Sequence, residues 1–126
     1  MSEQKLSFKE MCAKFEVTPR TLRYYEYIEL LKPQKEGRNR LYGPREVARM
    51  TLILRGRRFG FSLEDLRQWL LIYEERGNRP QLETFVEMAN RQLRELDRQR
   101  DELAATIEDL KATRDEAARL AKQSDS

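Results

Sequence analysis

Histidine is absent from this 126-residue sequence, and cysteine occurs only once, at Cys12. A single thiol excludes a disulfide within the chain, and without imidazole it also excludes a Cys/His zinc site built by one chain. Histidine is the side chain that enzymes use most often as a general acid or base, so its absence counts against catalysis. We therefore expect no catalytic residue, no metal site and no cofactor.

Long apolar runs and glycine-rich loops are missing as well. No apolar stretch approaches the roughly 18 residues that indicate a membrane-spanning helix, and the first residues form no signal-peptide pattern. None of the five glycines belongs to a glycine-rich phosphate loop. These absences predict a cytoplasmic protein without a membrane partner, and they argue further against an enzyme.

Charge is abundant but unevenly spread. The chain holds 25 Lys/Arg and 22 Asp/Glu, and its mean hydropathy is −0.86, so any globular core is small. Residues 1–80 hold 17 basic and 11 acidic side chains, whereas residues 81–126 hold 8 and 11. The most basic window, residues 18–58, has 11 basic and 4 acidic side chains. This asymmetry predicts that only the front half faces a polyanion such as nucleic acid, with an ordinary solvated surface as the alternative.

Two short helices are predicted in the basic front half. Ser7 is a candidate N-cap for a helix over about residues 8–15, whose apolar residues share one face and include Cys12 as a packing residue. Thr18 is a second candidate N-cap, followed by Pro19 at the first position of a helix that runs to about residue 26. Two such helices form a helix-turn-helix pattern, and an ordinary helical hairpin is the alternative.

The segment after the second helix predicts a small β-hairpin. Pro33 forces the residue before it into an extended conformation and ends the helical pattern. Gly37 lies between two short extended pieces in residues 34–42, which also hold several basic side chains. A basic hairpin directly after a helix-turn-helix favours a DNA-binding wing over an ordinary helical hairpin.

Two further helices are predicted, over about residues 45–59 and 63–73. The first is expected to bury a stripe of Val47, Met50, Thr51, Leu54 and Arg58, with Ile53 beside it. The second is expected to bury Leu66, Trp69, Leu70 and Tyr73. Gly60 ends the first helix and Ser62 caps the second. Residues 74–80 are predicted to be a linker.

The last part of the chain has a different apolar period. From residue 82 the apolar positions are spaced 4, 3, 4 and 3 residues apart over more than five heptads, which is typical of a coiled coil. At 1.5 Å per residue this helix spans roughly 60 Å, too long to be buried on the front half of the chain, so it predicts a homodimer. A long solvent-exposed helix is the alternative. The predicted interface residues are Leu82, Val86, Ala89, Leu93, Leu96, Leu103, Ile107, Leu110 and Ala117.

Two arginines in this seam, Arg100 and Arg114, favour an antiparallel dimer. A parallel, in-register pair would place each arginine opposite its own copy, and like charges at such short range repel. In an antiparallel pair whose facing residue numbers sum to 203, Leu93 faces Leu110 of the second chain. Arg114 then lies over the small Ala89 of that chain and extends past it to solvent, so no arginine layer forms.

At this point the sequence resembles the MerR family of bacterial transcription regulators. The resemblance rests on Val17-Thr-Pro-Arg-Thr-Leu-Arg-Tyr-Tyr-Glu26, Leu30-Leu31, Asn39-Arg-Leu-Tyr42 and Arg58-Phe-Gly-Phe-Ser-Leu-Glu-Asp-Leu-Arg67. It implies an all-α fold with a small β-hairpin wing, in which a winged helix-turn-helix DNA-binding domain covers residues 6–73. A linker over 74–80 and a dimerisation helix over 81–121, paired as an antiparallel coiled coil, complete the implied architecture.

The resemblance also implies a mode of action and a set of contact residues. Such a homodimer binds a near-palindromic operator in promoter DNA and bends and untwists it for RNA polymerase, as a nucleoid-associated protein. Arg23 has a second reading, in which it braces the wing through an ion pair. The implied DNA-binding residues are Thr18, Arg20, Arg23, Tyr24, Arg38, Arg40, Tyr42, Arg57 and Arg58.

Two features depart from the family pattern. Glu29 stands where the family usually has glycine, which predicts a differently shaped turn after the second helix. Residues 81–126 hold no cysteine and no added ligand domain, so sensing of metals, oxidants or drugs is not expected. Residues 52–61 are similar to short members that control branched-chain amino-acid and acyl-CoA breakdown, which points to a catabolic pathway. The effector, the operator, the target genes and the sign of regulation stay open.

Three other functions compete with a transcription regulator. An architectural or excisionase-like DNA-binding accessory protein would share the winged domain but needs no long dimer arm. A coiled-coil adaptor would not need the arginines and tyrosines of residues 18–42. An enzyme is disfavoured by the absent histidine. We therefore predict a sequence-specific DNA-binding regulator of transcription.

Overall fold

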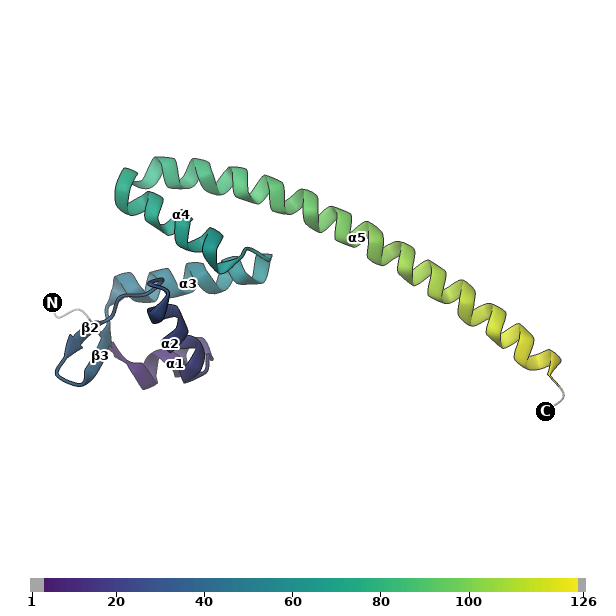
Figure 1. The fold of residues 1–126 in the computed structure, drawn as a ribbon, viewed down its shortest axis with the longest axis horizontal. Coiled ribbons are helices and arrows are strands. Elements are labelled where there is room, and N and C mark those ends of the chain that lie inside the picture. The colour runs from purple at the N-terminus through teal and green to yellow at the C-terminus, as the bar shows by residue number, and fades with distance from the viewer. Residues whose placement is uncertain (1–3, 125–126) are drawn as a thin grey trace. The chain divides into compact units, whose positions relative to one another are not determined.

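The computed structural model of the chain describes residues 4–124 (Figure 1). It confirms the predicted class, a mostly helical chain with one small sheet and a long last helix. The chain divides into two compact units, the first ending at Thr84 and the second beginning at Phe85. In chain order the elements are β1 (Leu6–Ser7), α1 (Phe8–Phe15), α2 (Pro19–Tyr27), β2 (Gln34–Glu36), β3 (Asn39–Tyr42), α3 (Pro44–Phe59), α4 (Leu63–Arg76) and α5 (Asn78–Gln123).

The sheet has three antiparallel strands in the order β1–β3–β2. Strands β2 and β3 form the predicted hairpin, with Lys35 opposite Arg40 and a left-handed Gly37 (φ 61°) in the turn. Strand β1 pairs with the other edge of β3, where Leu6 lies opposite Tyr42. The sequence did not predict β1, because two residues are too few to show the alternation of a strand.

Helices α1 and α2 begin at the predicted caps. The Ser7 hydroxyl accepts a hydrogen bond from the Glu10 N–H, and the Glu10 carboxylate accepts one from the Ser7 N–H. The Thr18 hydroxyl accepts from the Thr21 N–H at 3.1 Å. These bonds satisfy N–H groups that have no partner within the first turn of a helix. Cys12 is half-buried on α1 and burial raises the pKa of its thiol, in agreement with a packing role.

The core of the first unit lies between the inward faces of α1–α4, strand β3 and the loop after α2. Its fully buried large side chains include Met11, Leu22, Leu30, Leu31, Tyr42, Met50, Ile53 and Leu66. Trp69 and Leu70 of α4 are buried as predicted, whereas Tyr73 is 52% exposed. The indole N–H of Trp69 donates to the Gln81 carbonyl oxygen at 2.9 Å and thereby fastens α4 to the first turn of α5.

Helix α3 buries Met50 and Ile53 as predicted, but the rest of its predicted stripe is only partly buried or exposed. Its buried residues are Glu46, Met50, Ile53 and Gly56, whereas Thr51 and Arg58 are exposed. Glu46 is drawn inward because its carboxylate accepts the Lys32 N–H at 2.9 Å. Gly56 is needed for close packing, since a Cβ there would lie 2.4 Å from a terminal methyl carbon of Leu66. A glutamate and a glycine carry no hydrophobic signal, so the pattern missed these two positions and wrongly included Thr51 and Arg58.

Residues 74–80, predicted as a linker, are almost entirely helical. Helix α4 continues to Arg76 and α5 begins at Asn78, which leaves only Gly77 between them. Gly77 ends α4 with a left-handed φ of 90°. Pro80 is tolerated because it lies in the first turn of α5, where an N–H has no partner within the helix.

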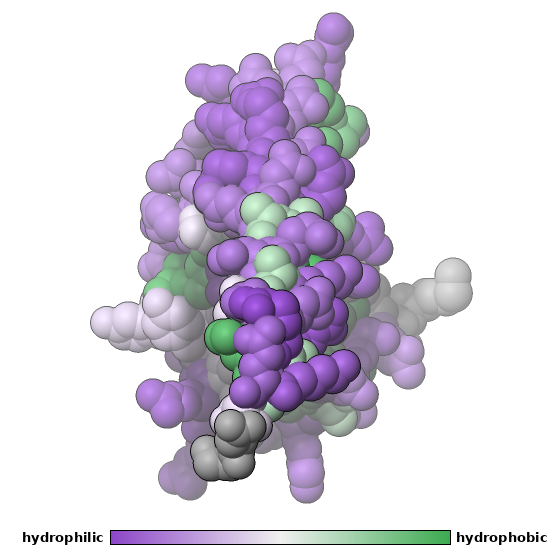
Figure 2. Space-filling model, turned by 90° about the vertical axis from the view of Figure 1, so that its right-hand side faces the viewer, coloured by the Kyte–Doolittle hydropathy of each residue, from purple (hydrophilic) through white to green (hydrophobic). Residues whose placement is uncertain are grey.

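The last helix exposes a row of apolar side chains. Helix α5 is 46 residues long, and in the single chain most of its predicted seam is open to solvent. Figure 2 shows apolar side chains emerging among the mostly hydrophilic residues of the surface. Contiguous exposed apolar side chains mark a surface that binds a partner. The large exposed apolar residues of α5 include Leu82, Val86, Leu93, Leu96, Leu103, Ile107, Leu110 and Leu120.

The turn after α2 contains Glu29 in a left-handed conformation, with φ 64°. The Glu29 N–H donates to the Glu26 carbonyl oxygen at 3.0 Å, and the Leu30 N–H donates to that of Tyr25 at 2.9 Å. These bonds end the helix and turn the chain toward the buried pair Leu30 and Leu31. The position thus has a backbone conformation that favours glycine, although glutamate occupies it.

Replacing Glu29 by glycine is expected to stabilise the fold by about 0.5–1 kcal/mol. The left-handed conformation costs a non-glycine residue roughly 1–2 kcal/mol, and the greater freedom of glycine in the unfolded chain offsets part of this gain. Urea unfolding of wild type and Glu29→Gly at one protein concentration measures the difference. Glu29→Ala, which retains a Cβ, serves as the control and should show no gain. A destabilised Glu29→Gly protein would contradict this account of the turn.

Candidate nucleic-acid interface

Helix α2 presents cations and aromatic rings to solvent. Leu22 and Tyr25 are 0% and 7% exposed, and their burial fixes the rotation of the helix about its own axis. The opposite side therefore carries Arg20, Tyr24 and Tyr27, spaced four and three residues apart on one face. Tyr24 is 50% exposed and Tyr27 is 83% exposed. Such a face offers hydrogen-bond donors and stacking surfaces but almost no negative charge.

Two open grooves border α2, and Arg23 and Tyr27 line both of them. The first groove, of about 670 Å³, contains three arginines and no carboxylate. It is lined by Arg20, Thr21, Arg23, Tyr24, Tyr25, Tyr27, Arg57 and Leu63. The second, of about 430 Å³, contains four cations and one carboxylate. It is lined by Arg23, Glu26, Tyr27, Leu31, Lys32, Pro33, Lys35 and Arg40.

The carboxylate of Glu26 joins α2 to strand β3. The Tyr42 hydroxyl donates a hydrogen bond to one carboxylate oxygen, and Nε of Arg40 lies 3.6 Å from the other. The Glu26 side chain is only 12% exposed, so these two partners replace most of its hydration. Burial and the bond to Glu26 raise the pKa of the Tyr42 hydroxyl far above its ordinary value, which keeps it a donor. Because Tyr42 is 0% exposed, it cannot contact DNA as predicted and instead holds the hairpin in place.

Arg23 and Arg40 share the aromatic ring of Phe8. The guanidinium carbon of Arg23 lies 5.4 Å from the ring centroid, and that of Arg40 lies 5.5 Å from it. Both distances are within the range of cation–π attraction. The sequence left open whether Arg23 contacts DNA or braces the hairpin through an ion pair. In the structure the bracing ion pair is made by Arg40, with Glu26.

The loop between α2 and β2 is tied to α3. Arg49 donates through Nε to the Leu30 carbonyl oxygen at 3.1 Å, and Glu46 holds the Lys32 N–H. The Glu74 carboxylate of α4 pairs with Arg49 at 3.0 Å and also with Arg45. These contacts hold the base of the hairpin on the helical core, so the hairpin and α2 share one support.

The other predicted contact residues are exposed at the borders of this surface. Thr18 caps α2, and its hydroxyl lies 3.0 Å from that of Thr21. Arg57 donates to the Phe61 carbonyl oxygen at 2.9 Å and still lines the first groove. Within residues 4–124, the side chains of Arg38 and Arg58 make no hydrogen bond or ion pair, so their charges are available to a ligand.

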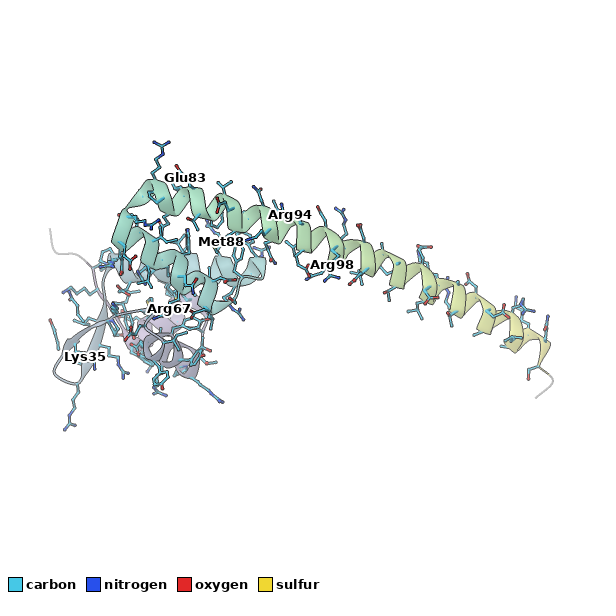
Figure 3. The ribbon with its side chains drawn as sticks, turned by 45° about the horizontal axis from the view of Figure 1, so that its top comes forward. Lys35, Arg67, Glu83, Met88, Arg94 and Arg98 are labelled. Atoms are coloured by element: carbon cyan, nitrogen blue, oxygen red, sulfur yellow. The ribbon has the colours of Figure 1, made fainter. Side chains whose placement is uncertain are left out.

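The groove-lining residues that sequence reasoning did not assign to the interface include Tyr27, Lys32 and Lys35. Tyr27 follows Arg20 and Tyr24 at helical spacing, and this signal was sufficient to find it. Lys32 and Lys35 lie on either side of Pro33, and Lys35 is on β2 (labelled in Figure 3). Their place beside α2 depends on how the loop folds back, which no local pattern shows.

The described residues show neither a metal-binding cluster nor a membrane-spanning helix. In residues 4–124, no group of three or more His, Cys, Asp or Glu side chains is placed to hold a metal ion. In the same part of the chain, no helix combines the length and the hydropathy that crossing a bilayer requires.

Two family models match the chain, and together they cover nearly all of it. The model described as "MerR HTH family regulatory protein" matches residues 6–71, which hold α1, α2, the sheet and α3. The model described as "MerR, DNA binding" matches residues 47–116, which run from α3 into α5. Each model covers more than half of the chain.

Individual proteins similar to this chain are also regulators of transcription. The HTH-type transcriptional regulator HmrR of Rhizobium leguminosarum bv. viciae is 36% identical over 97 residues, which is 72% of each chain. A MerR-family regulator from Bacillus cereus has a similar structure, with a TM-score of 0.73 and 26% identity over 98% of this chain and 87% of that one. HiNmlR, a MerR-family regulator lacking the sensor domain and solved on promoter DNA, shares the fold at 18% identity and a TM-score of 0.65, over 83% of this chain and 80% of its own.

Replacing Tyr42 by phenylalanine is expected to destabilise the fold by about 1.5–3 kcal/mol. The change leaves a mostly buried carboxylate oxygen of Glu26 without its donor, and hydrogen bonds to charged groups have about this value. Urea unfolding at neutral pH measures the loss.

The pH dependence gives a second readout of the same contact. The folded-state pKa of Tyr42 is raised, so its contribution is complete below the ordinary tyrosine pKa of about 10 and falls as the pH rises beyond it. Wild type should therefore lose stability above pH 10 more steeply than Tyr42→Phe. Tyr27→Phe, at an exposed tyrosine, is the matched control and should resemble wild type. Equal stability of Tyr42→Phe and wild type would show that the hydrogen bond from Tyr42 to Glu26 does not stabilise the fold.

Proposed function

We propose that this chain, which belongs to the MerR family of DNA-binding transcription regulators, acts as a homodimer on a near-palindromic promoter operator. The matches are to regulators of transcription and not to enzymes. In this proposal residues 6–73 bind DNA and residues 81–121 form the dimer. RNA polymerase is the further partner at the promoter, and a catabolic pathway is the hypothesis for the controlled genes.

The observation that carries the proposal is the position of α2 between two cationic grooves. The major groove of B-DNA is about 12 Å wide and admits one α-helix, which then has a phosphate backbone on either side. In this proposal Arg20, Arg23 and Tyr24 of α2 contact base edges and nearby phosphates. The N-terminus of α2, capped by Thr18, offers N–H groups and a favourable dipole to a phosphate.

The two grooves supply the contacts that orient the protein on the duplex. Arg40 of the hairpin lines the second groove and Arg57 near the end of α3 lines the first, and Arg38 and Arg58 are close to them in the sequence. Phosphate contacts fix the register of a protein on DNA, whereas contacts to base edges specify the sequence. Cations on both sides of one recognition helix therefore support binding to double-stranded DNA rather than to an isolated phosphate.

The exposed seam of α5 supports the dimer. A helix whose large apolar side chains are roughly half exposed gains stability by burying them against a second copy. We place the second copy antiparallel, with facing residue numbers that sum to 203. Two recognition helices related by a two-fold axis read two half-sites of a near-palindrome. Holding both half-sites on one rigid dimer bends and untwists the DNA between them, which changes how polymerase meets the promoter.

Iterative selection from random duplex DNA tests this function directly. We expect a dimer in solution that enriches a two-fold palindrome, with half-sites one helical turn or a multiple apart. On a promoter built around that sequence, transcription should depend on the spacer length between promoter elements. Binding with no enriched sequence would favour an architectural or excisionase-like accessory protein, as would transcription without spacer dependence.

Charge-matched variants check that the grooves meet the DNA. Lys35→Ala removes a cation that lines the second groove. It should weaken binding to every sequence and lower the slope of log K against log salt by about 0.9 for each phosphate that the protein no longer neutralises. Arg79→Ala also removes one positive charge, but from a side chain of α5 that is paired with Glu83 outside both grooves. It should leave the slope unchanged, and equal effects of the two variants would argue against the grooves as the contact surface.

Cysteine crosslinking tests the antiparallel pairing. In a Cys12→Ser background, Leu93→Cys and Leu110→Cys proteins should form a disulfide-linked dimer after they are mixed and oxidised. Neither protein should crosslink alone, because residues 93 and 110 face each other only between chains that run in opposite directions. Efficient crosslinking of Leu93→Cys alone would demonstrate a parallel dimer instead.

A further inference from the structure

Phe8 occupies an unexpected place in the candidate interface. It is the first residue of α1 and belongs neither to α2 nor to the hairpin. Its half-buried ring nevertheless lies against one guanidinium from each of them, at 5.4 Å for Arg23 and 5.5 Å for Arg40. We propose that Phe8 is a positioning residue that holds Arg23 and Arg40 in their DNA-binding arrangement before DNA is bound. This inference rests on the proposed function, because it concerns the same surface.

An aromatic ring is suited to this task because it fixes a guanidinium without neutralising it. The attraction acts through the ring face, so the N–H groups at the guanidinium edge remain free to donate to phosphates or bases. An ion pair would occupy those donors and cancel the charge. Arg40 shows both kinds of contact, and its approach to Glu26 uses only Nε, at 3.6 Å.

The ring also couples two elements that must meet the duplex together. Arg23 lies on α2, and Arg40 lies on strand β3. Contact of both guanidiniums with one ring fixes the spacing between a base-reading position and a phosphate-binding position. A long arginine side chain that is already ordered loses less conformational entropy when it binds, so the free protein is pre-organised for its operator.

The competing explanation is that Phe8 only packs on α1 with Met11 and Phe15. Leucine preserves an apolar side chain of similar reach but has no ring face, whereas tryptophan preserves the ring. We therefore compare Phe8→Leu and Phe8→Trp with wild type, and urea unfolding first establishes that each variant is folded. On the selected operator we expect Phe8→Leu to bind about tenfold more weakly, because two cation–π attractions are removed. Phe8→Trp should bind within about twofold of wild type.

The salt dependence separates positioning from loss of charge. Phe8→Leu keeps every cation, so its slope of log K against log salt should equal that of wild type. In an Arg40→Ala background the Phe8→Leu penalty should shrink, whereas in an Arg20→Ala background it should persist, because Arg20 does not touch the ring. Equal operator affinity of folded Phe8→Leu and wild type would overturn the inference, as would penalties that are equal in the two backgrounds.

A readout without DNA separates this inference from the proposed function. A ring face shields nearby nuclei, so the Nε–Hε signals of Arg23 and Arg40 in the NMR spectrum should move when Phe8→Leu removes the ring. Absence of an enriched operator with wild type would remove the proposed function even if these signals move. Unmoved signals, or an operator that Phe8→Leu binds as well as wild type does, would remove only the role of Phe8.

Discussion

The partly buried carboxylate of Glu26 determines how the front half of the chain is arranged. It lies on α2, and both of its partners, Tyr42 and Arg40, come from strand β3. Tyr42 also pairs with Leu6 of β1, so the same strand connects the hairpin to the start of α1. A carboxylate removed from water must keep its partners, because leaving it unpaired costs several kcal/mol. The hairpin is therefore held to α2 by a contact that is expensive to break, and the second cationic groove, which Glu26 and Arg40 line, depends on that contact for its shape.

The same contact explains how a densely basic segment can fold and still present positive charge. Residues 18–58 contain four carboxylates, of which Glu26 and Glu46 are turned inward. Each of these two carboxylates binds a group outside its own helix, so both connect segments of the fold and add little negative charge to the surface. The outward surface is consequently more cationic than the sequence count suggests. The first groove, which contains three arginines and no carboxylate, is the clearest instance.

The sequence was sufficient where a local rule dominates and failed where tertiary contacts decide. Ser7, Thr18 and Pro19 marked the starts of α1 and α2 because capping is a local interaction. The inner face of α3 was predicted only in part: Met50 and Ile53 are buried as expected, but Glu46 and Gly56 are buried by contacts with the Lys32 N–H and with Leu66. Residues 74–80 contain glycine and proline yet form helix, since Trp69 and Gln81 fasten the start of α5. For the candidate site, the sequence predicted Arg20 and Arg23 of α2 and Arg40 of the hairpin, which line the grooves, but it also predicted DNA contact for Tyr42, which is buried. The contacts of Phe8 with Arg23 and Arg40 could not be predicted, because these residues are distant in sequence.

The structure of the single chain also changes the argument about the coiled coil. Arg100 pairs with Asp97 at 3.3 Å and with Asp101 at 3.6 Å, and Arg114 pairs with Asp115, all on the same helix. Carboxylates on the same helix reduce the repulsion between facing arginines, so charge alone separates parallel from antiparallel pairing less than the sequence suggested. Side-chain volume still separates them. A parallel, in-register pair would set Ala89 and Ala117 opposite their own copies and leave gaps, and unfilled space in a core is costly. The antiparallel pairing places Arg114 over Ala89 and Val86 over Ala117 of the second chain, so each small residue meets a larger one, and this filling of space is the stronger reason to expect it.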